Sequence, residues 1–352
     1  MSKKKVWGIV AILAILAGLL IVATVFFSVG FNFSKLSKEI YARTAYTPEE
    51  SFDEIEIHST FFDVKLLPLA EGEEPLIYLP FSGNLSHRAT VQDGKLSIFL
   101  EDGRTWYERW SLFNVSNENT VIELHLPMAG YDKLKVKLNS GDIYVDKRMD
   151  EEHELTFSHV KLETSTGDIQ FGANTKGGGS ISLSAGTGDI AVSGAQGVSL
   201  CAEVSTGHIS LWDCVLTSVN ATATTGDIKL ENVQGTGMVL KLSSGDIKLT
   251  NVSAGSMALT ASTGDVELFD VLVEGELRAE TGTGEIDIER SDAGSLWIET
   301  DTGDVEMTLL SGKMYHVETG TGERRYPEHD RDGGRCVVKT DTGDVEITVI
   351  PK

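Results

Sequence analysis

Hydrophobic and polar residues alternate along much of the chain between residues 131 and 350. Around Gly245, for example, the hydrophobic positions are Met238, Leu240, Leu242, Ile247, Leu249 and Val252. The residues between them are nearly all polar. Because successive side chains of a β-strand point to opposite faces, this period of two predicts strands with one buried face. We therefore predict two short strands here, one on each side of Gly245.

Gly245 belongs to a short cassette that recurs eleven times between Asn139 and Val345: a Ser or Thr, the Gly, usually an Asp, and usually an Ile or Val. The cassette glycines are Gly141, Gly167, Gly188, Gly207, Gly226, Gly245, Gly264, Gly284, Gly303, Gly322 and Gly343. Most of them lie 19–21 residues after the previous one. A fixed period of this length is typical of a solenoid, whose coils bury their hydrophobic faces by stacking on one another. The predicted fold class is all-β, a β-solenoid similar to a parallel β-helix with about 19–21 residues per coil.

Two turns per coil are predicted from the glycine and polar positions. The cassette Gly is expected at one corner, because glycine adopts positive φ without steric cost. The second corner follows six residues later, where the chain has Asn232, Asn251 or Asp270, and another Gly comes after it. Each coil is therefore expected to contain at least two short strands joined by two turns.

The two ends of the repeat array differ from its middle. Residues 51–130 contain alternating segments without clean cassettes, and Phe62 occupies the place of a cassette Gly. We predict a β cap over 51–130 and the solenoid repeats over 131–350. Near the C-terminus, Arg324 and Arg325 interrupt the last-but-one cassette, and a charged loop covers 323–335. One further coil follows, and we expect these features to protect the terminal strand from aggregation.

The N-terminal segment 6–33 contains no charged residue and is preceded by Lys3, Lys4 and Lys5. About 20 apolar residues suffice to cross a bilayer as a helix, so this segment is predicted to be a transmembrane signal anchor. A cleaved signal peptide is the alternative, but no Ala-x-Ala site follows the run. The lysines favour a cytoplasmic segment 1–5, a linker over 34–50 and an extracytoplasmic C-terminal domain. The expected location is the bacterial cell membrane, with the lipid bilayer as a partner through residues 6–33.

Charge and cysteine usage narrow the partners. The chain has 30 Lys and Arg against 53 Asp and Glu, a formal net charge of -23. Such a surface repels nucleic acid, so no nucleic-acid partner is predicted. Cys214 and Cys336 fall on inward positions of the repeat and Cys201 on an outward one, without metal-ligand spacing or a disulfide framework. We predict free thiols, and neither a metal site nor a cofactor.

The anchor, the degenerate β cap and the serial Thr-Gly-Asp-Ile or Ser-Gly-Asp-Ile cassettes together resemble the bacterial putative-adhesin β-strand repeat family, a domain of unknown function. The resemblance covers roughly residues 51–350. It implies an extracytoplasmic, membrane-tethered β-solenoid, and some anchored members resemble proteins linked to cell-envelope stress responses. The family has no catalytic residues to transfer to this chain, and His208, Glu285 and Glu323 replace the cassette Asp in three repeats.

The Asp that follows the cassette Gly is the strongest candidate for chemistry. Stacked coils place these residues in a column with a spacing of about 4.8 Å. We predict that they accept hydrogen bonds from turn amides of their own or adjacent coils. Two alternatives remain open, namely weak cation binding and a carboxylate pair of the kind that glycosidases use. The cation candidates are Asp227, Asp246, Asp265 and Asp304. No catalytic residue is predicted, because repeated acids in equivalent surroundings do not form an acid and a base.

Candidate partner contacts are the outward aromatic residues and the charged C-terminal loop. They are Arg324, Arg325, Tyr326, Arg331, Trp212 and Trp297. The leading prediction is a non-enzymatic adhesive, structural or envelope-stress-sensing module that contacts a cell-envelope polymer, a glycan or a membrane protein. Two alternatives stay open: a β-helix polysaccharide lyase or hydrolase, and a self-assembling scaffold.

Overall fold

A computed structural model describes residues 18, 41–69, 72–83, 85–102, 120–146, 155–331 and 333–350, without the side chains of residues 102, 174, 176 and 177. The predicted signal anchor, apart from the single residue Gly18, lies outside the described residues. Among the residues that the structure describes, no helix has the length and apolar character needed to cross a membrane.

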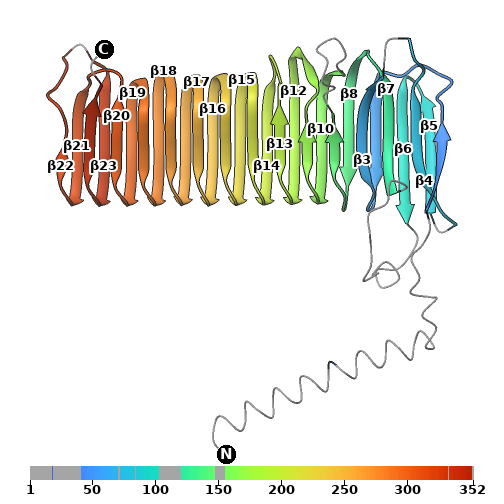
Figure 1. Cartoon of the computed structure of the whole chain (residues 1–352), viewed down its shortest axis with the longest axis horizontal. Coiled ribbons are helices and arrows are strands. Elements are labelled where there is room, and N and C mark those ends of the chain that lie inside the picture. The colour runs from blue at the N-terminus through green and yellow to red at the C-terminus, as the bar shows by residue number, and fades with distance from the viewer. Residues whose placement is uncertain are drawn as a thin grey trace, which may run out of the picture.

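The described chain is built from 24 strands that join in one sheet (Figure 1). The first nine are β1 (Ala42–Tyr46), β2 (Glu54–Ser59), β3 (Asp63–Leu69), β4 (Leu76–Phe81), β5 (Leu85–Gln92), β6 (Lys95–Asp102), β7 (Val121–Pro127), β8 (Gly130–Leu138) and β9 (Ile143–Val145). The middle strands are β10 (Thr156–Thr166), β11 (Ile169–Phe171), β12 (Asn174–Thr187), β13 (Ile190–Ser193), β14 (Ser199–Thr206), β15 (Ile209–Thr225), β16 (Ile228–Ser244), β17 (Ile247–Thr263), β18 (Val266–Thr283) and β19 (Ile286–Thr302). The last are β20 (Val305–Leu309), β21 (Met314–Thr321), β22 (Arg324–Arg325), β23 (Arg335–Thr342) and β24 (Val345–Val349).

The repeats stack as parallel coils, which confirms the predicted all-β solenoid. β15 pairs with β16, β16 with β17, and β17 with β18, and each residue faces its equivalent in the neighbouring coil. Ile209, Ile228 and Ile247, for example, form one row. Figure 1 shows the stacked coils as a long rod, in which the chain advances from the blue N-terminal end to the red C-terminal end.

Each coil turns at the positions that the sequence predicted. Asn232, Asn251 and Asp270 have φ between 53° and 56°, so the six-residue offset from the cassette Gly marks a left-handed bend inside a long strand. Asn and Asp tolerate this conformation better than other non-glycine residues. The inward rows between these bends form one continuous hydrophobic cluster from Ile55 to Ile347. Cys214 and Cys336 are buried in it as free thiols, as predicted.

The cassette glycines are required by two independent constraints. Their φ values lie between 120° and 154°, a region that residues with a Cβ avoid. Stacking adds a second constraint, because a Cβ on Gly245 would lie 2.3 Å from the carbonyl oxygen of Gly226. The backbone of each corner passes so close to the corner of the adjacent coil that a methyl group has no space.

The N-terminal end contains a coil that is out of chain order. β2 pairs with both β6 and β8, and β3 pairs with both β7 and β9, so the first coil is inserted between later segments. Phe62 lies at the cassette corner of this coil, beneath Gly141, which confirms the degenerate repeat. β5 and β4 then run antiparallel to β6 and β7, and β1 pairs with β4. The predicted linker 34–50 therefore includes a strand, β1.

The C-terminal end repeats this arrangement. β23 pairs with β19 and β21, and β24 pairs with β20 and β22. The last coil in the sequence is thus the last but one in space, and the coil with the interrupted cassette forms the end of the rod. Arg324, at a position that is inward in other coils, is exposed because no further coil covers it.

Candidate functional site

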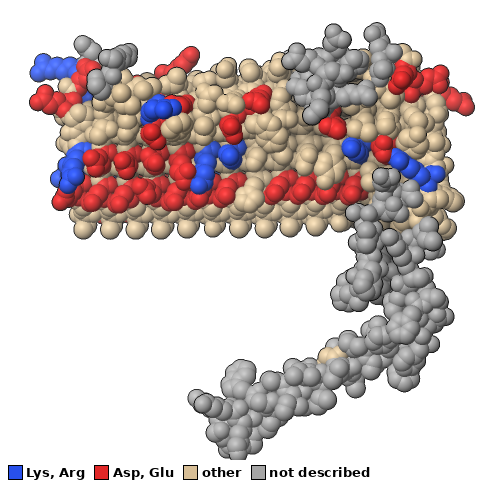
Figure 2. All heavy atoms as spheres, viewed as in Figure 1, with Lys and Arg blue, Asp and Glu red and all other residues tan. Residues whose placement is uncertain are grey.

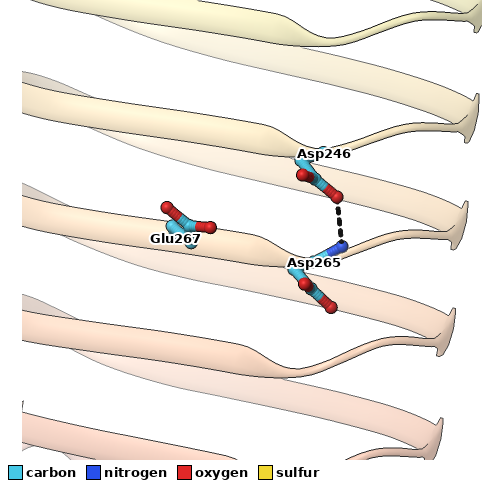
Figure 3. A group of neighbouring side chains, drawn as sticks. All are labelled: Asp246, Asp265 and Glu267. Carbon is cyan, nitrogen blue, oxygen red and sulfur yellow. Dashed lines mark hydrogen bonds between the residues drawn. The ribbon is translucent and has the colours of Figure 1, made fainter.

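The residue after each cassette Gly, together with Asp63 after Phe62, forms a column along the rod, which we call the cassette acid column. Its members are Asp63, Asp142, Asp168, Asp189, His208, Asp227, Asp246, Asp265, Glu285, Asp304, Asp344 and Glu323 in their order along the rod. The amide of Asp265 donates a hydrogen bond to Oδ1 of Asp246 at 3.0 Å (Figure 3), and the amide of Asp246 donates to Oδ1 of Asp227 at 3.0 Å. The same bond recurs from Asp63 to Glu285 and again through Asp304, Asp344 and Glu323. The acids accept amide hydrogen bonds from adjacent coils, as predicted.

His208 keeps this ladder intact although it is not an acid. Its amide donates to Oδ1 of Asp189 at 2.7 Å, and its Nδ1 accepts the amide of Asp227 at 2.9 Å. The imidazole nitrogen thus replaces a carboxylate oxygen. This role requires Nδ1 to carry no proton. At this coil a neutral acceptor therefore makes the bond that a carboxylate makes elsewhere in the column.

A second acidic column lies beside the first in the C-terminal half of the rod. It contains Glu267, Asp287, Glu306 and Glu346, which face one another in consecutive coils. Figure 2 shows the two columns as adjacent rows of acidic residues along the lower part of the rod, the upper row being confined to the C-terminal half. Burial, followed by the charges of Glu306, Glu289 and Glu267, raises the pKa of Asp287. Burial and four neighbouring carboxylates likewise raise the pKa of Glu285.

We predict that Asp287→Asn stabilises the rod by roughly 0.2–1 kcal/mol at neutral pH and low salt, since like charges directly opposite on a sheet repel. A raised folded-state pKa means that ionisation destabilises the fold. This penalty is complete above the folded-state pKa and disappears as the pH falls below the ordinary Asp value. The advantage of the variant, measured as the midpoint of urea unfolding, should therefore shrink on acidification and at high salt.

Glu267→Gln is the matched control for this prediction. Glu267 belongs to the same column, but its Oε1 lies 2.9 Å from Nζ of Lys248, so removing its charge also removes an attractive contact. We expect a smaller gain or none. Destabilisation of the rod by Asp287→Asn at low salt would show that repulsion in the column is not significant.

The predicted cation candidates separate into two groups. Oxygen atoms of Asp246, Asp265 and Glu267 all lie within 4.8 Å of one another (Figure 3), a spacing that would suit a cation. Lys248 already supplies the positive charge there, with Nζ 2.9 Å from Glu267 and 3.5 Å from Asp246. Among the described residues, Asp227 and Asp304 are not part of such a group. Their Oδ1 atoms accept the amides of Asp246 and Asp344.

A hollow interrupts the same face of the rod towards its N-terminal end. It has a volume of about 490 Å³ and extends from Val121 in β7, past Tyr144, to Trp212 in β15. The coils between Tyr144 and Trp212 carry the small residues Gly172, Ala191 and Ser193 beside Gln170. Its polar lining comes from Asp63, Lys65, Asp146 and Gln170. The sequence interpretation missed this feature apart from Trp212. The run of small residues at outward positions three and five after the cassette Gly was the available signal.

Comparison with known families identifies the domain. The chain matches the family Toastrack DUF4097 over residues 52–348. It belongs to the Toastrack DUF4097 family. This confirms the predicted relationship to a bacterial β-strand repeat family of unknown function.

Solved structures share low sequence identity with this Toastrack chain. A putative lipid-binding protein from Parabacteroides distasonis is 14% identical, with 87% of this chain and 97% of that chain covered and a TM-score of 0.37. A putative adhesin from Bacteroides fragilis is 12% identical, with coverages of 89% and 98% and a TM-score of 0.28. A putative cell adhesion protein from Clostridium sporogenes is 9% identical, with coverages of 88% and 100% and a TM-score of 0.17. No curated protein matches the chain significantly.

The predicted partner contacts of the Toastrack domain do not form one site. Arg324, Arg325, Tyr326 and Arg331 belong to the C-terminal end, where the Tyr326 ring lies 6.0 Å from Tyr315 and 6.3 Å from His329. Trp297 lies on the strand segment that precedes a cassette, between Arg278 and Lys339 at 5.4 and 5.5 Å from the ring. Trp212 lies many coils away, at the edge of the hollow.

Proposed function

We propose that this Toastrack protein is a membrane-anchored, extracytoplasmic rod that binds a component of the cell envelope without catalysing a reaction on it. Residues 6–33 supply the anchor in this proposal, and the solenoid serves an adhesive, structural or envelope-stress-sensing role. The observation that carries it is the cassette acid column. Each bonded acid in it accepts a backbone amide of the next coil, so the most abundant candidate catalytic groups are engaged in holding the coils together.

The electrostatics of the face support binding over catalysis. General acid–base chemistry needs two groups whose surroundings move their pKa values apart. Here the pKa values of Glu285 and Asp287 move in the same direction, upwards, because desolvation and neighbouring like charges disfavour both ionised forms. Neither residue lines the hollow beside Trp212. A repeated surface instead favours contacts that recur along a polymer and gain strength from their number.

The ends of the rod argue against the scaffold alternative. At each end of the rod, a coil from another part of the sequence is inserted between the terminal coil and the rest of the stack. Antiparallel strands also extend the N-terminal end. At the other end, exposed Arg324 and Arg325 stand where other coils carry the inward side chain and its neighbour. Charged edge positions disfavour end-to-end strand pairing.

The full-length protein in detergent or nanodiscs tests the proposal. It should co-sediment with isolated envelope polymers and release no new reducing ends from them. Protease added to intact cells should remove the solenoid, as expected for an extracytoplasmic domain. Reducing-end release that one acid substitution abolishes, with the melting temperature unchanged, would replace the proposal with the lyase or hydrolase alternative. Complete protection of the solenoid in intact cells would contradict the topology.

A further inference from the structure

The hollow between Tyr144 and Trp212 is a departure from the repeat. Position three after the cassette carries Lys65, Tyr144, Gln170, Ala191 and Ser210 in consecutive coils. The equivalent column is acidic at the C-terminal end of the rod. The column at position five carries Gly172 and Ser193, and Ser193 is followed directly by Trp212. Tyr144 and Trp212 therefore flank two coils whose outward side chains, apart from Gln170, are small.

The dimensions of the hollow suit a chain of rings. Tyr144 and Trp212 are three coils apart, which corresponds to about 14 Å at the spacing of parallel strands. Between Tyr144 and Trp212 the floor consists of paired strands whose outward groups are Gln170, Gly172, Ala191 and Ser193. A volume of about 490 Å³ lies within the range of small-molecule sites. A ligand of two or three linked rings could lie along the rod axis here.

Hydrogen bonds fix the Tyr144 hydroxyl and the Trp212 backbone. Tyr144 donates its hydroxyl hydrogen to Oδ2 of Asp142 at 2.9 Å, and burial raises the Tyr144 pKa, so the hydroxyl stays neutral. The backbone oxygen of Trp212 accepts the amide of Gly194 at 3.2 Å. Trp212 is 39% exposed and lines the hollow. An aromatic ring on a rigid strand provides apolar contact area at low entropic cost.

We propose that this hollow binds a neutral oligosaccharide of two or three sugar rings. The inference rests on the proposed binding function and names its ligand class. The apolar C–H face of a sugar ring would pack on Trp212, while its hydroxyls would reach Gln170, Lys65 and Asp146, which supply donors and acceptors. Both charge signs line the hollow, and the cassette acid column nearby disfavours an anionic sugar.

Defined neutral hexose and N-acetylhexosamine oligomers of two to four rings are the probes. Binding to the full-length protein in detergent is measured by isothermal titration calorimetry. Trp212→Ala should weaken binding about tenfold or more, since it removes the stacking surface. Ser193→Trp should abolish binding by filling the hollow. The backbone is expected to accept this change, because the equivalent residue of the next coil is Trp212. Val239→Ala is the control, because it shortens an exposed hydrophobic side chain that does not line the hollow and should leave binding unchanged.

Melting temperatures within the error of the wild type verify that the variants fold. The inference is overturned if no probe binds the wild type, or if Trp212→Ala and Ser193→Trp both bind as the wild type does. Co-sedimentation with envelope polymers is measured on the same variants. Polymer binding that persists in both variants would leave the proposed function standing and remove the hollow as its site. Absence of polymer binding by the wild type would refute the proposed function, whatever the oligomer titrations show.

Discussion

Gly264→Ala is expected to destabilise the solenoid by roughly 2–6 kcal/mol, the sum of backbone strain and overpacking. The added Cβ would lie 1.8 Å from the carbonyl oxygen of Gly245 and 2.5 Å from its carbonyl carbon. The residue also has a φ of 133°, which a residue with a Cβ avoids. Because the obstacle is the backbone of the adjacent coil, no side-chain rotation relieves the contact. The measurement is the midpoint of urea unfolding followed by circular dichroism.

Gly237→Ala is the matched control, in a neighbouring coil. A Cβ at this position meets Ser256 Oγ at 3.9 Å as its nearest atom, and the backbone is outside the left-handed region. Alanine should be neutral here or slightly stabilising, because it lowers the entropy of the unfolded chain. Equal losses in Gly237→Ala and Gly264→Ala would show that close stacking of the cassette corners does not limit stability.

Ile228→Lys is expected to cost about 4 kcal/mol or more, or to prevent folding. Ile228 is 0% exposed and lies between Ile209 and Ile247 in the central row of the core. A lysine at this position would have apolar side chains on both sides of it in the core. Its ammonium group would be buried there without a partner, which is strongly unfavourable. Expression level, thermal unfolding and protease resistance of the full-length protein measure the effect.

The adjacent residue provides the control for this substitution. Lys229 is exposed, and its Nζ lies 4.0 Å from Glu231 in a contact between two solvated side chains. Such pairs contribute little, so Lys229→Glu should change stability by no more than about 0.5 kcal/mol. Comparable losses at residues 228 and 229 would mean that the assignment of inward and outward positions is wrong.

The fold of a single coil was predictable because its constraints are local. Alternation placed Ile228 inside and Lys229 outside, and the structure confirms both positions. The cassette Gly and Asn232 marked the two bends through their tolerance of positive φ. Phe62 was recognised as a degenerate corner because the hydrophobic residues around it kept the spacing of the repeat. Each of these signals depends on the conformation of a few consecutive residues.

The arrangement of the two ends was not predictable in this way. Nothing in the alternation of 335–349 distinguishes a coil added at the end of the rod from one inserted beneath the preceding coil. The order depends on which strand pairs with the β19 segment that contains Leu296 and Ile298. That strand is β23, and β21 pairs with the other edge of β23. The first coil, β2 and β3, shows the same ambiguity at the other end. Strand pairing over such distances is decided by the whole stack.

Some features of the candidate site were likewise predictable from the sequence, and others were not. The sequence indicated that the cassette acids accept turn amides, since Asp is the residue that makes such bonds. It did not show that Lys248 already occupies the group formed by Asp246 and Glu267, because that contact joins two coils through side-chain geometry. The hollow beside Trp212 likewise depends on Gly172 and Ser193 lying next to it, although each comes from a different coil.

The period and the inward rows of this Toastrack solenoid follow from local sequence alone, because a strand alternates and a tight corner requires glycine whatever surrounds it. The order of the terminal coils, the pairing of charges across coils and the shape of the exposed face depend on the folded stack. Those properties arise between residues that are one or more coils apart, where packing selects among pairings that are equally compatible with the local pattern.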